Sequence, residues 1–373
     1  MNTGATDFTA RWAGIASSAL AGLSTADFRT RWKALADSGV LAGVRDGPRG
    51  VVTDTLAAIE GLGIGGTSPG LCYALTSQHF GVQSPLRAAG SAAWAALSEG
   101  VERGDTLMCH ALTEEGGGSD PLSMATRAEP ANGGWVLTGR KAFVTAAPIA
   151  DHALVFARTD VERTPFALSA FLVDLSSAGV SRSEPFPKKA LTDVPMGAID
   201  FDSVRLGPEQ LVGREGAGLA LLTTTTSWER GLLLGYALGP MRLVLDRTVE
   251  WARRRKQFGR PMGASHLVAG RLADMATLLH RSRTLIFAMA QRFDSGEPAR
   301  RLASEAAMTK VSVSEDLLSF TQHAAALGGV RSFVSDTGLT ADLTDAMAAA
   351  VYAGPNDLLR VSVARELGLP VEN

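Results

Sequence analysis

Apolar residues recur at helical spacing through roughly the first hundred positions of the chain. The clearest series is Phe8, Trp12, Ile15, Leu20 and Leu23. Asp27 ends a Ser-Thr-Ala-Asp run that supplies an N-cap, so a second helix is expected from Phe28. A third is expected over residues 53–59. We therefore predict an all-helical N-terminal domain, residues 1–105.

After that point the pattern changes to short runs that alternate or are rich in β-branched residues. They are separated by glycine, proline and charged turns, and they cover residues 135–137, 142–145, 152–158, 167–174 and 198–204. A period of two is typical of strands that bury one face. We predict a middle β domain, residues 106–212, built as a small barrel or sandwich.

Helical spacing returns at Gly213. Helices are expected over about 215–255, 264–294, 297–327 and 336–352, followed by a short last one. Helices, strands and helices in separate blocks predict an α+β fold, with a C-terminal helical domain over residues 213–373.

Composition and charge narrow the functional classes. The chain has 373 residues, 46% of them apolar, which is enough for two or three domains. Its formal net charge is −2 and the charges are dispersed, so no nucleic-acid or membrane partner is expected. Cys72 and Cys109 are far apart and lack metal-ligand spacing, so no metal is expected. No leader pattern or membrane-length apolar run is present, and a soluble cytoplasmic protein is predicted.

Three consecutive glycines mark the most informative stretch, residues 112–120 (LTEEGGGSD). Glycines let backbone N–H groups approach an anion closely, and Thr113 and Ser119 add hydroxyl groups. A flexible surface hairpin is the alternative interpretation. The strands expected at 135–141 and 142–145, which end at Thr145, favour a cradle for a large flat cofactor with a phosphate tail.

A second glycine-rich run, residues 61–66 (GLGIGG), has the spacing of a dinucleotide-binding fingerprint. That fingerprint requires a preceding strand, whereas a helix-like stretch precedes this run. We interpret it as a loop between helices.

Four segments, in the right order, resemble signatures of the acyl-CoA dehydrogenase family. Residues 112–120 are similar to its flavin-binding signature LTEPxAGSD, and residues 139–145 (GRKAFVT) to its GxKxWI(T/S) motif. The other two are residues 255–259 (RKQFG) and residues 352–356 (YAGPN), the latter followed by 363–366 (VARE). The resemblance covers nearly the whole chain. It implies an N-terminal helical domain, a middle β domain and a C-terminal four-helix bundle.

The resemblance implies FAD as the cofactor. The residues it assigns to the flavin and pyrophosphate are Leu112, Thr113, Gly118, Ser119, Phe143 and Thr145. The residues that resemble contacts to the FAD of a neighbouring subunit are Arg255, Phe258, Gly328 and Gly329. A homodimer or homotetramer is implied in the same way.

The implied reaction is α,β-dehydrogenation of an acyl thioester, carried on CoA or on an acyl-carrier protein. A base removes the α proton while a hydride passes to the flavin, because no side chain accepts a hydride. The reaction requires a carboxylate of raised pKa and hydrogen-bond donors aimed at the thioester oxygen. Most relatives carry this base as the Glu of a YEGT loop, but here the loop reads YAGP from Tyr352 to Pro355.

Glu229 is the candidate base. One branch of the family, which includes isovaleryl-type dehydrogenases, carries the base on the first helix of the C-terminal bundle, directly before an arginine. Glu229 and Arg230 stand at the matching point. The helical face of Glu229 also carries Leu232, Leu233 and Tyr236, surroundings that raise a carboxyl pKa. A structural ion pair with a neighbouring arginine is the alternative.

The same resemblance implies the surroundings of the substrate. The backbone N–H of Ala353 is the candidate donor to the thioester oxygen, and Arg230, Tyr352 and Gly354 would border the substrate. The electron acceptor would be an electron-transfer flavoprotein or O2.

The chain also departs from the family pattern at four positions: Glu115, Ala325, Arg331 and Pro355. These departures suggest a divergent member of the kind that acts on carrier-protein thioesters in polyketide or peptide pathways. A flavin-dependent oxidase or hydroxylase on the same scaffold is one alternative. A catalytically silent relative that binds an acyl carrier is another.

Overall fold

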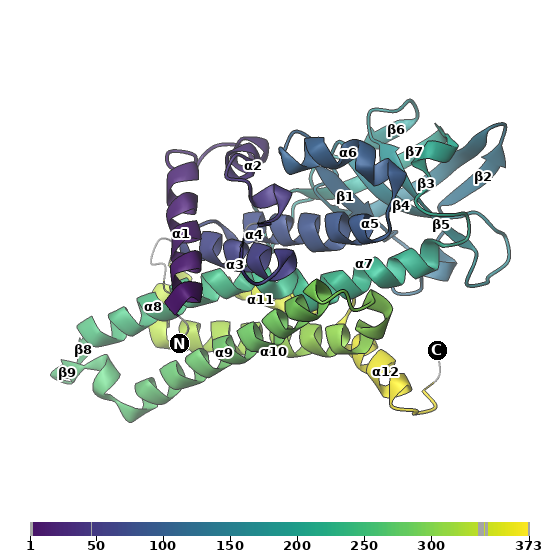
Figure 1. Cartoon of the computed structure of the whole chain (residues 1–373). Coiled ribbons are helices and arrows are strands. Elements are labelled where there is room, and N and C mark those ends of the chain that lie inside the picture. The colour runs from purple at the N-terminus through teal and green to yellow at the C-terminus, as the bar shows by residue number, and fades with distance from the viewer. Residues whose placement is uncertain (1–2, 46, 335–338, 340–341, 372–373) are drawn as a thin grey trace.

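The computed structural model describes residues 3–45, 47–334, 339 and 342–371. Its N-terminal helices lie beside the β domain and pack along the C-terminal helices (Figure 1). They are α1 (Thr3–Ala19), α2 (Phe28–Ala36), η1 (Val40–Ala42), α3 (Val51–Ile64), α4 (Pro69–Thr76), the π-helix η2 (Ser77–Gln83), α5 (Ser84–Ala88) and α6 (Ala92–Glu102). Asp27 caps α2 as predicted, because its carboxylate accepts the Thr30 N–H at 3.0 Å.

Helix α3 continues through the glycine-rich run, so its interpretation as a loop was wrong for Gly61 and Gly63. A Cβ atom on Gly61 would lie 2.6 Å from the Thr9 carbonyl oxygen, and one on Gly63 would lie 2.6 Å from Pro240 Cδ. The two glycines therefore allow α1 and α8 (Leu238–Arg254) to pack closely against α3. The elements described before Gly61 are helices, which also argues against a dinucleotide-binding turn.

The middle domain is a curled sheet of seven strands. They are β1 (Met108–Ala111), β2 (Arg127–Ala131), β3 (Gly134–Thr145), β4 (His152–Arg158), β5 (Leu168–Asp174), β6 (Val180–Arg182) and β7 (Met196–Leu206). The order is β1-β4-β2-β3-β7-β6, and β5 pairs with β4. Because β4 pairs with β1, β2 and β5, the sheet bends around it and encloses its own apolar core.

Residues 135–145, predicted as two strands, form the single long strand β3. Its pairing with β7 is irregular between Leu137 and Gly139 and again between Lys141 and Val144. Within the second irregularity Phe143 has a φ of 57°, an uncommon conformation for a bulky residue, and its side chain is 54% exposed. The irregularity therefore turns Phe143 outward just before the strand ends at Thr145.

The C-terminal domain consists of helices with one short hairpin. They are α7 (Gly218–Leu232), the 3₁₀ segment η5 (Leu233–Ala237), α8, the hairpin β8 (Lys256–Gln257) and β9 (Arg260–Pro261), α9 (His266–Asp294), α10 (Ala303–Gly328), α11 (Leu343–Ala348) and α12 (Asn356–Glu366). The continuous helix expected over about 215–255 is divided by η5, which is buried against α3 and α4. The helix expected at 336–352 falls partly outside the described residues, and α11 lies within that range.

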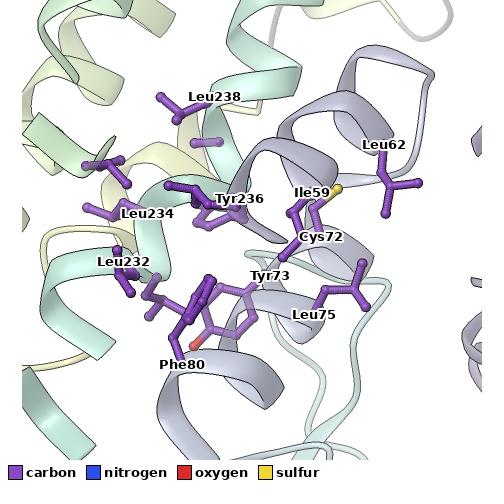
Figure 2. Close-up of a cluster of buried hydrophobic side chains, with 14 of the residues drawn as sticks. Ile59, Leu62, Cys72, Tyr73, Leu75, Phe80, Leu232, Leu234, Tyr236 and Leu238 are labelled. Atoms are coloured by element: carbon purple, nitrogen blue, oxygen red, sulfur yellow. The ribbon is translucent and has the colours of Figure 1, made fainter. Parts of the chain in front are cut away.

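The largest apolar core joins the N-terminal and C-terminal helices. Figure 2 shows part of it, where Ile59 of α3 and Tyr73 of α4 lie beside Tyr236 of η5. The α+β fold is confirmed. The domain limits at 105 and 212 fall between α6 and β1 and between η4 (Pro208–Gln210) and α7, and they remain a proposal. In the described part of the chain, no helix has the length and apolarity of a membrane span, and no three metal-ligating side chains cluster.

Candidate active site

The glycine stretch forms a tight turn directly after β1. The Glu114 N–H donates to the Gly117 carbonyl at 3.0 Å, and the Gly117 N–H donates back at 3.1 Å. The Glu114 carboxylate accepts the Ala125 and Thr126 N–H groups at 2.6 and 2.9 Å, and it pairs with buried Lys141 at 2.9 Å. The inner side of the turn is therefore fixed by an ion pair that the sequence analysis did not identify.

The outer side of the turn carries free donors. Among the described residues, the backbone N–H groups of Gly116, Gly118 and Ser119 have no hydrogen-bond acceptor, and neither do the hydroxyls of Thr113 and Ser119. A Cβ atom on Gly116 or Gly117 would meet no atom within 4 Å, whereas one on Gly118 would lie 2.9 Å from Thr113 Oγ1. An open turn with unused donors fits the pyrophosphate of FAD.

Hydrogen bonds join this turn to the end of β3. The Ala142 N–H donates to the Thr113 carbonyl at 2.8 Å, and Lys141 Nζ donates to the Leu112 carbonyl at 2.9 Å. Leu112 and Thr113 therefore lie beside the outward-facing Phe143. The predicted flavin contacts that gather around this turn and strand are Leu112, Thr113, Gly118, Ser119, Phe143 and Thr145.

The other predicted cofactor contacts lie elsewhere, and they are Arg255, Phe258, Gly328 and Gly329. Arg255 ends α8 and Phe258 connects β8 to β9, at the end of the helical domain remote from the sheet (Figure 1). Gly329 follows α10 near the same end, where the guanidinium groups of Arg255 and Arg331 lie 5.8 and 4.9 Å from the Trp251 ring centroid. A single chain does not bring these residues to the glycine turn.

Glu229 lies on α7, opposite α4 and η2. A Cβ atom on Gly81 would lie 3.7 Å from Glu229 Oε1 and 3.8 Å from Ser77 Oγ. Tyr73 lies close enough for the charge of Glu229 to raise its pKa. Tyr73, Ser77 and Gly81 follow one another at intervals of four residues, so they share one helical face. This face borders the Glu229 carboxylate, and Gly81 leaves space beside it.

Burial dominates the electrostatics of Glu229. The residue keeps some accessible surface, but protein surrounds its carboxylate and raises its pKa to about 7. The charges of Arg230 and Lys310 offset part of this rise. No described residue forms a hydrogen bond or an ion pair with the carboxylate, so the alternative of a structural ion pair does not apply here. A carboxylate with a pKa near neutrality suits general-base chemistry.

Two cations, the half-buried Arg230 and the buried Lys310, hold the loop at residues 352–355 through its carbonyl oxygens. Arg230 Nε donates to the Ala353 carbonyl at 3.0 Å. Lys310 Nζ donates to the Gly354 carbonyl and to Asn356 Oδ1, both at 2.8 Å. Ala353 has a φ of 54°, and no described group accepts its N–H. The predicted thioester donor is therefore available, and Arg230 supports the loop that carries it.

Lys310 was not predicted from the sequence as a residue of the site. Its side chain is 1% exposed and lies on the face of α10 that also buries Val313, Leu317 and Phe320. Burial lowers its pKa to about 8. The available signal was a single lysine at the helical spacing of apolar residues, because a lysine is almost never fully buried without a specific partner.

All three tyrosines of the chain meet between α4, η5 and the 352–355 loop. The Tyr73 ring packs edge-on against Tyr236 and Tyr352, with ring centroids 5.6 and 5.2 Å apart. The Tyr352 hydroxyl donates to the Tyr236 hydroxyl at 2.9 Å. In Figure 2 the Tyr73 hydroxyl points away from Tyr236, and it faces Thr145 and Glu229. The Tyr73 side chain therefore lies between Glu229, the candidate base, and Thr145 at the end of β3.

Comparison with known proteins identifies the family. Residues 109–204 match the acyl-CoA dehydrogenase middle domain, and residues 216–368 match the acyl-CoA dehydrogenase C-terminal domain. The chain is 31% identical over 317 residues to the L-prolyl-[peptidyl-carrier protein] dehydrogenase of Serratia sp. (strain ATCC 39006), a match that covers 85% of this chain and 81% of that protein. The chain belongs to the acyl-CoA dehydrogenase family.

Solved structures of the family agree with this fold along its whole length. PigA with FAD and proline superposes with a TM-score of 0.89 at 28% identity, covering 100% of this chain and 99% of that one. The prolyl acyl carrier protein oxidase AnaB superposes with a TM-score of 0.90 at 27% identity, covering 99% of this chain and 100% of that one. This acyl-CoA dehydrogenase family member is a flavoprotein oxidoreductase, and FAD as its cofactor is confirmed.

Proposed function

We propose that this acyl-CoA dehydrogenase family member oxidises an acyl thioester, with Glu229 as the base. The observation that carries the proposal is the position of Glu229. Its carboxylate has a pKa of about 7 and has no hydrogen-bond partner among the described residues. It also faces Tyr73, whose hydroxyl faces Thr145 at the end of β3. A base in that position can reach a substrate that lies between α7 and the end of β3.

The residues of the chain divide the reaction between them. Glu229 accepts the α proton, and the Ala353 N–H donates to the thioester oxygen and stabilises the negative charge that develops there. Arg230 and Lys310 hold the carbonyl groups of Ala353 and Gly354, which fixes the direction of that N–H. Bound FAD supplies the acceptor for the β-hydride. Tyr352 and Gly354 border the acyl group from the same loop.

The substrate that we favour is a prolyl group on a carrier protein. The Serratia relative is named for L-prolyl-carrier dehydrogenation, and AnaB for prolyl-carrier oxidation. Both names give a prolyl group and a carrier protein, whereas other relatives are named as dehydrogenases of CoA derivatives. The departures at Glu115, Ala325 and Arg331 are consistent with a divergent member that serves a secondary pathway.

The proposal leaves two electron acceptors, which the family resemblance implies. A dehydrogenase would pass its electrons to an electron-transfer flavoprotein, and an oxidase would pass them to O2. The name of AnaB gives the oxidase alternative specific support. Hydroxylation and a catalytically silent role have no comparable support.

The FAD site is completed by a second copy of the chain. Arg255, Phe258 and the glycine pair lie far from their own glycine turn, as a contribution to a partner requires (Figure 1). The same end of the molecule exposes large apolar side chains, among them Phe258, Leu267, Val330 and Phe333. Exposed apolar groups gathered in this way are typical of protein interfaces. We therefore retain the homodimer or homotetramer as part of the proposal.

One experiment separates these functions. The purified yellow protein is mixed anaerobically with L-prolyl, butyryl and isovaleryl thioesters, each as a pantetheine, a CoA and a carrier-protein derivative, and the flavin absorbance is followed. Bleaching fastest with the L-prolyl carrier thioester is expected. Bleaching with none of the thioesters would contradict the proposal and leave the silent relative. If a thioester does bleach the flavin, the reduced protein is next exposed to air. Rapid recovery of the flavin absorbance would assign an oxidase, and slow recovery would assign a dehydrogenase.

A further inference from the structure

We propose that Tyr73 and Ser77 form a polar subsite that binds the ring nitrogen of the substrate. This inference rests on the proposed function, because it assigns residues to the part of a prolyl thioester that a simple acyl thioester lacks. The substrate class it predicts is an aminoacyl thioester with its nitrogen on the α carbon.

The subsite lies opposite the base. Tyr73, Ser77 and Gly81 lie on the face of α4 and η2 that borders Glu229, and the side chain missing at Gly81 leaves Ser77 Oγ and Glu229 Oε1 on the borders of the same space. The change from α-helix to π-helix occurs at Ser77 itself. Such π-helical turns occur often at functional sites. In a prolyl thioester the nitrogen is bonded to the carbon that loses its proton, so it must lie next to the base.

The position of the Tyr73 hydroxyl is fixed because two other tyrosines pack against the Tyr73 ring. Tyr236 and Tyr352 hydrogen-bond to each other and pack edge-on against the ring. Figure 2 shows the Tyr73 hydroxyl on the side away from Tyr236. The residue is 7% exposed, and its hydroxyl faces Thr145 and Glu229. Burial raises the pKa of Tyr73 well above its usual value, so the hydroxyl stays protonated and can donate.

Part of the hydrogen-bonding capacity of this face is unused, although the Tyr73 hydroxyl already interacts with Thr145. Among the described residues, the Ser77 hydroxyl has no hydrogen-bond partner. The charged group that borders the same space as the Ser77 hydroxyl is Glu229, and the charges of Arg230 and Lys310 act in turn on the Glu229 carboxylate. Arg230 and Lys310 donate to the loop carbonyls, so the neutral polar groups on this wall are the Ser77 hydroxyl and the Tyr73 hydroxyl, which also interacts with Thr145. A neutral ring nitrogen has one lone pair and one N–H, so it accepts a hydrogen bond from one hydroxyl and donates one to the other. A methylene in its place makes neither hydrogen bond and leaves buried polar groups without that partner.

The test compares two substrates of almost the same shape, L-prolyl pantetheine thioester and cyclopentanecarbonyl pantetheine thioester. The readout is the rate of anaerobic flavin reduction by each. The wild-type protein should prefer the prolyl thioester. Tyr73→Phe and Ser77→Ala should each lower that preference by about 10- to 100-fold, by slowing the prolyl reaction while the cyclopentanecarbonyl rate changes little.

Tyr236→Phe is the matched control, because it removes a hydroxyl from the same cluster on the side away from Glu229. It should leave the preference unchanged. FAD content and thermal unfolding are measured for each variant. If Tyr73→Phe and Ser77→Ala slow both substrates equally, or neither, the subsite is refuted while the proposed function stands. If the wild-type protein is not reduced by the prolyl thioester at all, the subsite and the prolyl substrate are both refuted, whereas reduction by another acyl thioester would leave the oxidation by Glu229 standing.

Discussion

The pH dependence of flavin reduction follows directly from the surroundings of Glu229. Burial raises its pKa from 4.5 to about 7, a shift that corresponds to about 3 kcal/mol against the charged form. Below that pKa the carboxyl is protonated and has no capacity to accept the α proton, and above it the base is ionised. About one tenth of the molecules therefore carry the active base one unit below the pKa, and about nine tenths one unit above it.

The assay is anaerobic stopped-flow reduction of the flavin at thioester concentrations well below saturation, where the rate reports the pKa of Glu229 in the free protein, from about pH 5.5 to about pH 8.5. The rate should rise about tenfold per pH unit at the acidic end and level off above the pKa of Glu229. FAD content at each pH is the control, because loss of cofactor would also slow the reaction. A rate that is flat across this range, as a carboxyl with the ordinary pKa of 4.5 would give, would refute the assignment of the base.

A charge variant tests the cause of the midpoint. The charge of Lys310 lowers the pKa of Glu229, so Lys310→Met should raise that pKa and move the midpoint to higher pH. Met also removes the hydrogen bonds to Gly354 and Asn356, so thermal unfolding and FAD content are followed in parallel. A midpoint that moves to lower pH would contradict the electrostatic reasoning.

Two further predictions concern the subunit contact and the empty base position of the loop. Arg255→Ala should lower FAD occupancy with little change in the fold, whereas Arg254→Ala, on the adjacent surface, should retain FAD. A monomer by light scattering that keeps full FAD would exclude the contribution of a partner. In a Glu229→Gly background, Ala353→Glu should raise the rate of flavin reduction at least about tenfold, because a loop carboxylate then reaches the same α carbon. No recovery in a variant that retains FAD would mean that the loop does not face that carbon.

Features that depend on local sequence were predictable. The cap at Asp27 and strand β4 follow from short-range patterns. The glycine turn does as well, because its conformation needs residues without side chains. Glu229 could be assigned because its position relative to Arg230 is part of a motif, and its raised pKa followed from the apolar residues on the same helix.

Features that depend on distant packing were not predictable. Gly61 and Gly63 lie inside α3 because α1 and α8 approach its backbone, and nothing in the local pattern indicates those neighbours. Lys310 became a candidate only when the fold placed its amine against the carbonyl of Gly354, which is 44 residues away in the sequence. Tyr73 belongs to the site for the same reason, since the helical domains and β3 meet around it.

The central claim is that Glu229 removes the α proton. Glu229→Gln keeps the shape of the side chain and removes the proton acceptor. With the L-prolyl thioester, flavin reduction in a single anaerobic turnover should slow by about 10²–10⁴-fold while FAD content and thioester affinity stay close to those of the wild-type protein. Reduction at the wild-type rate would mean that the base lies elsewhere in the molecule.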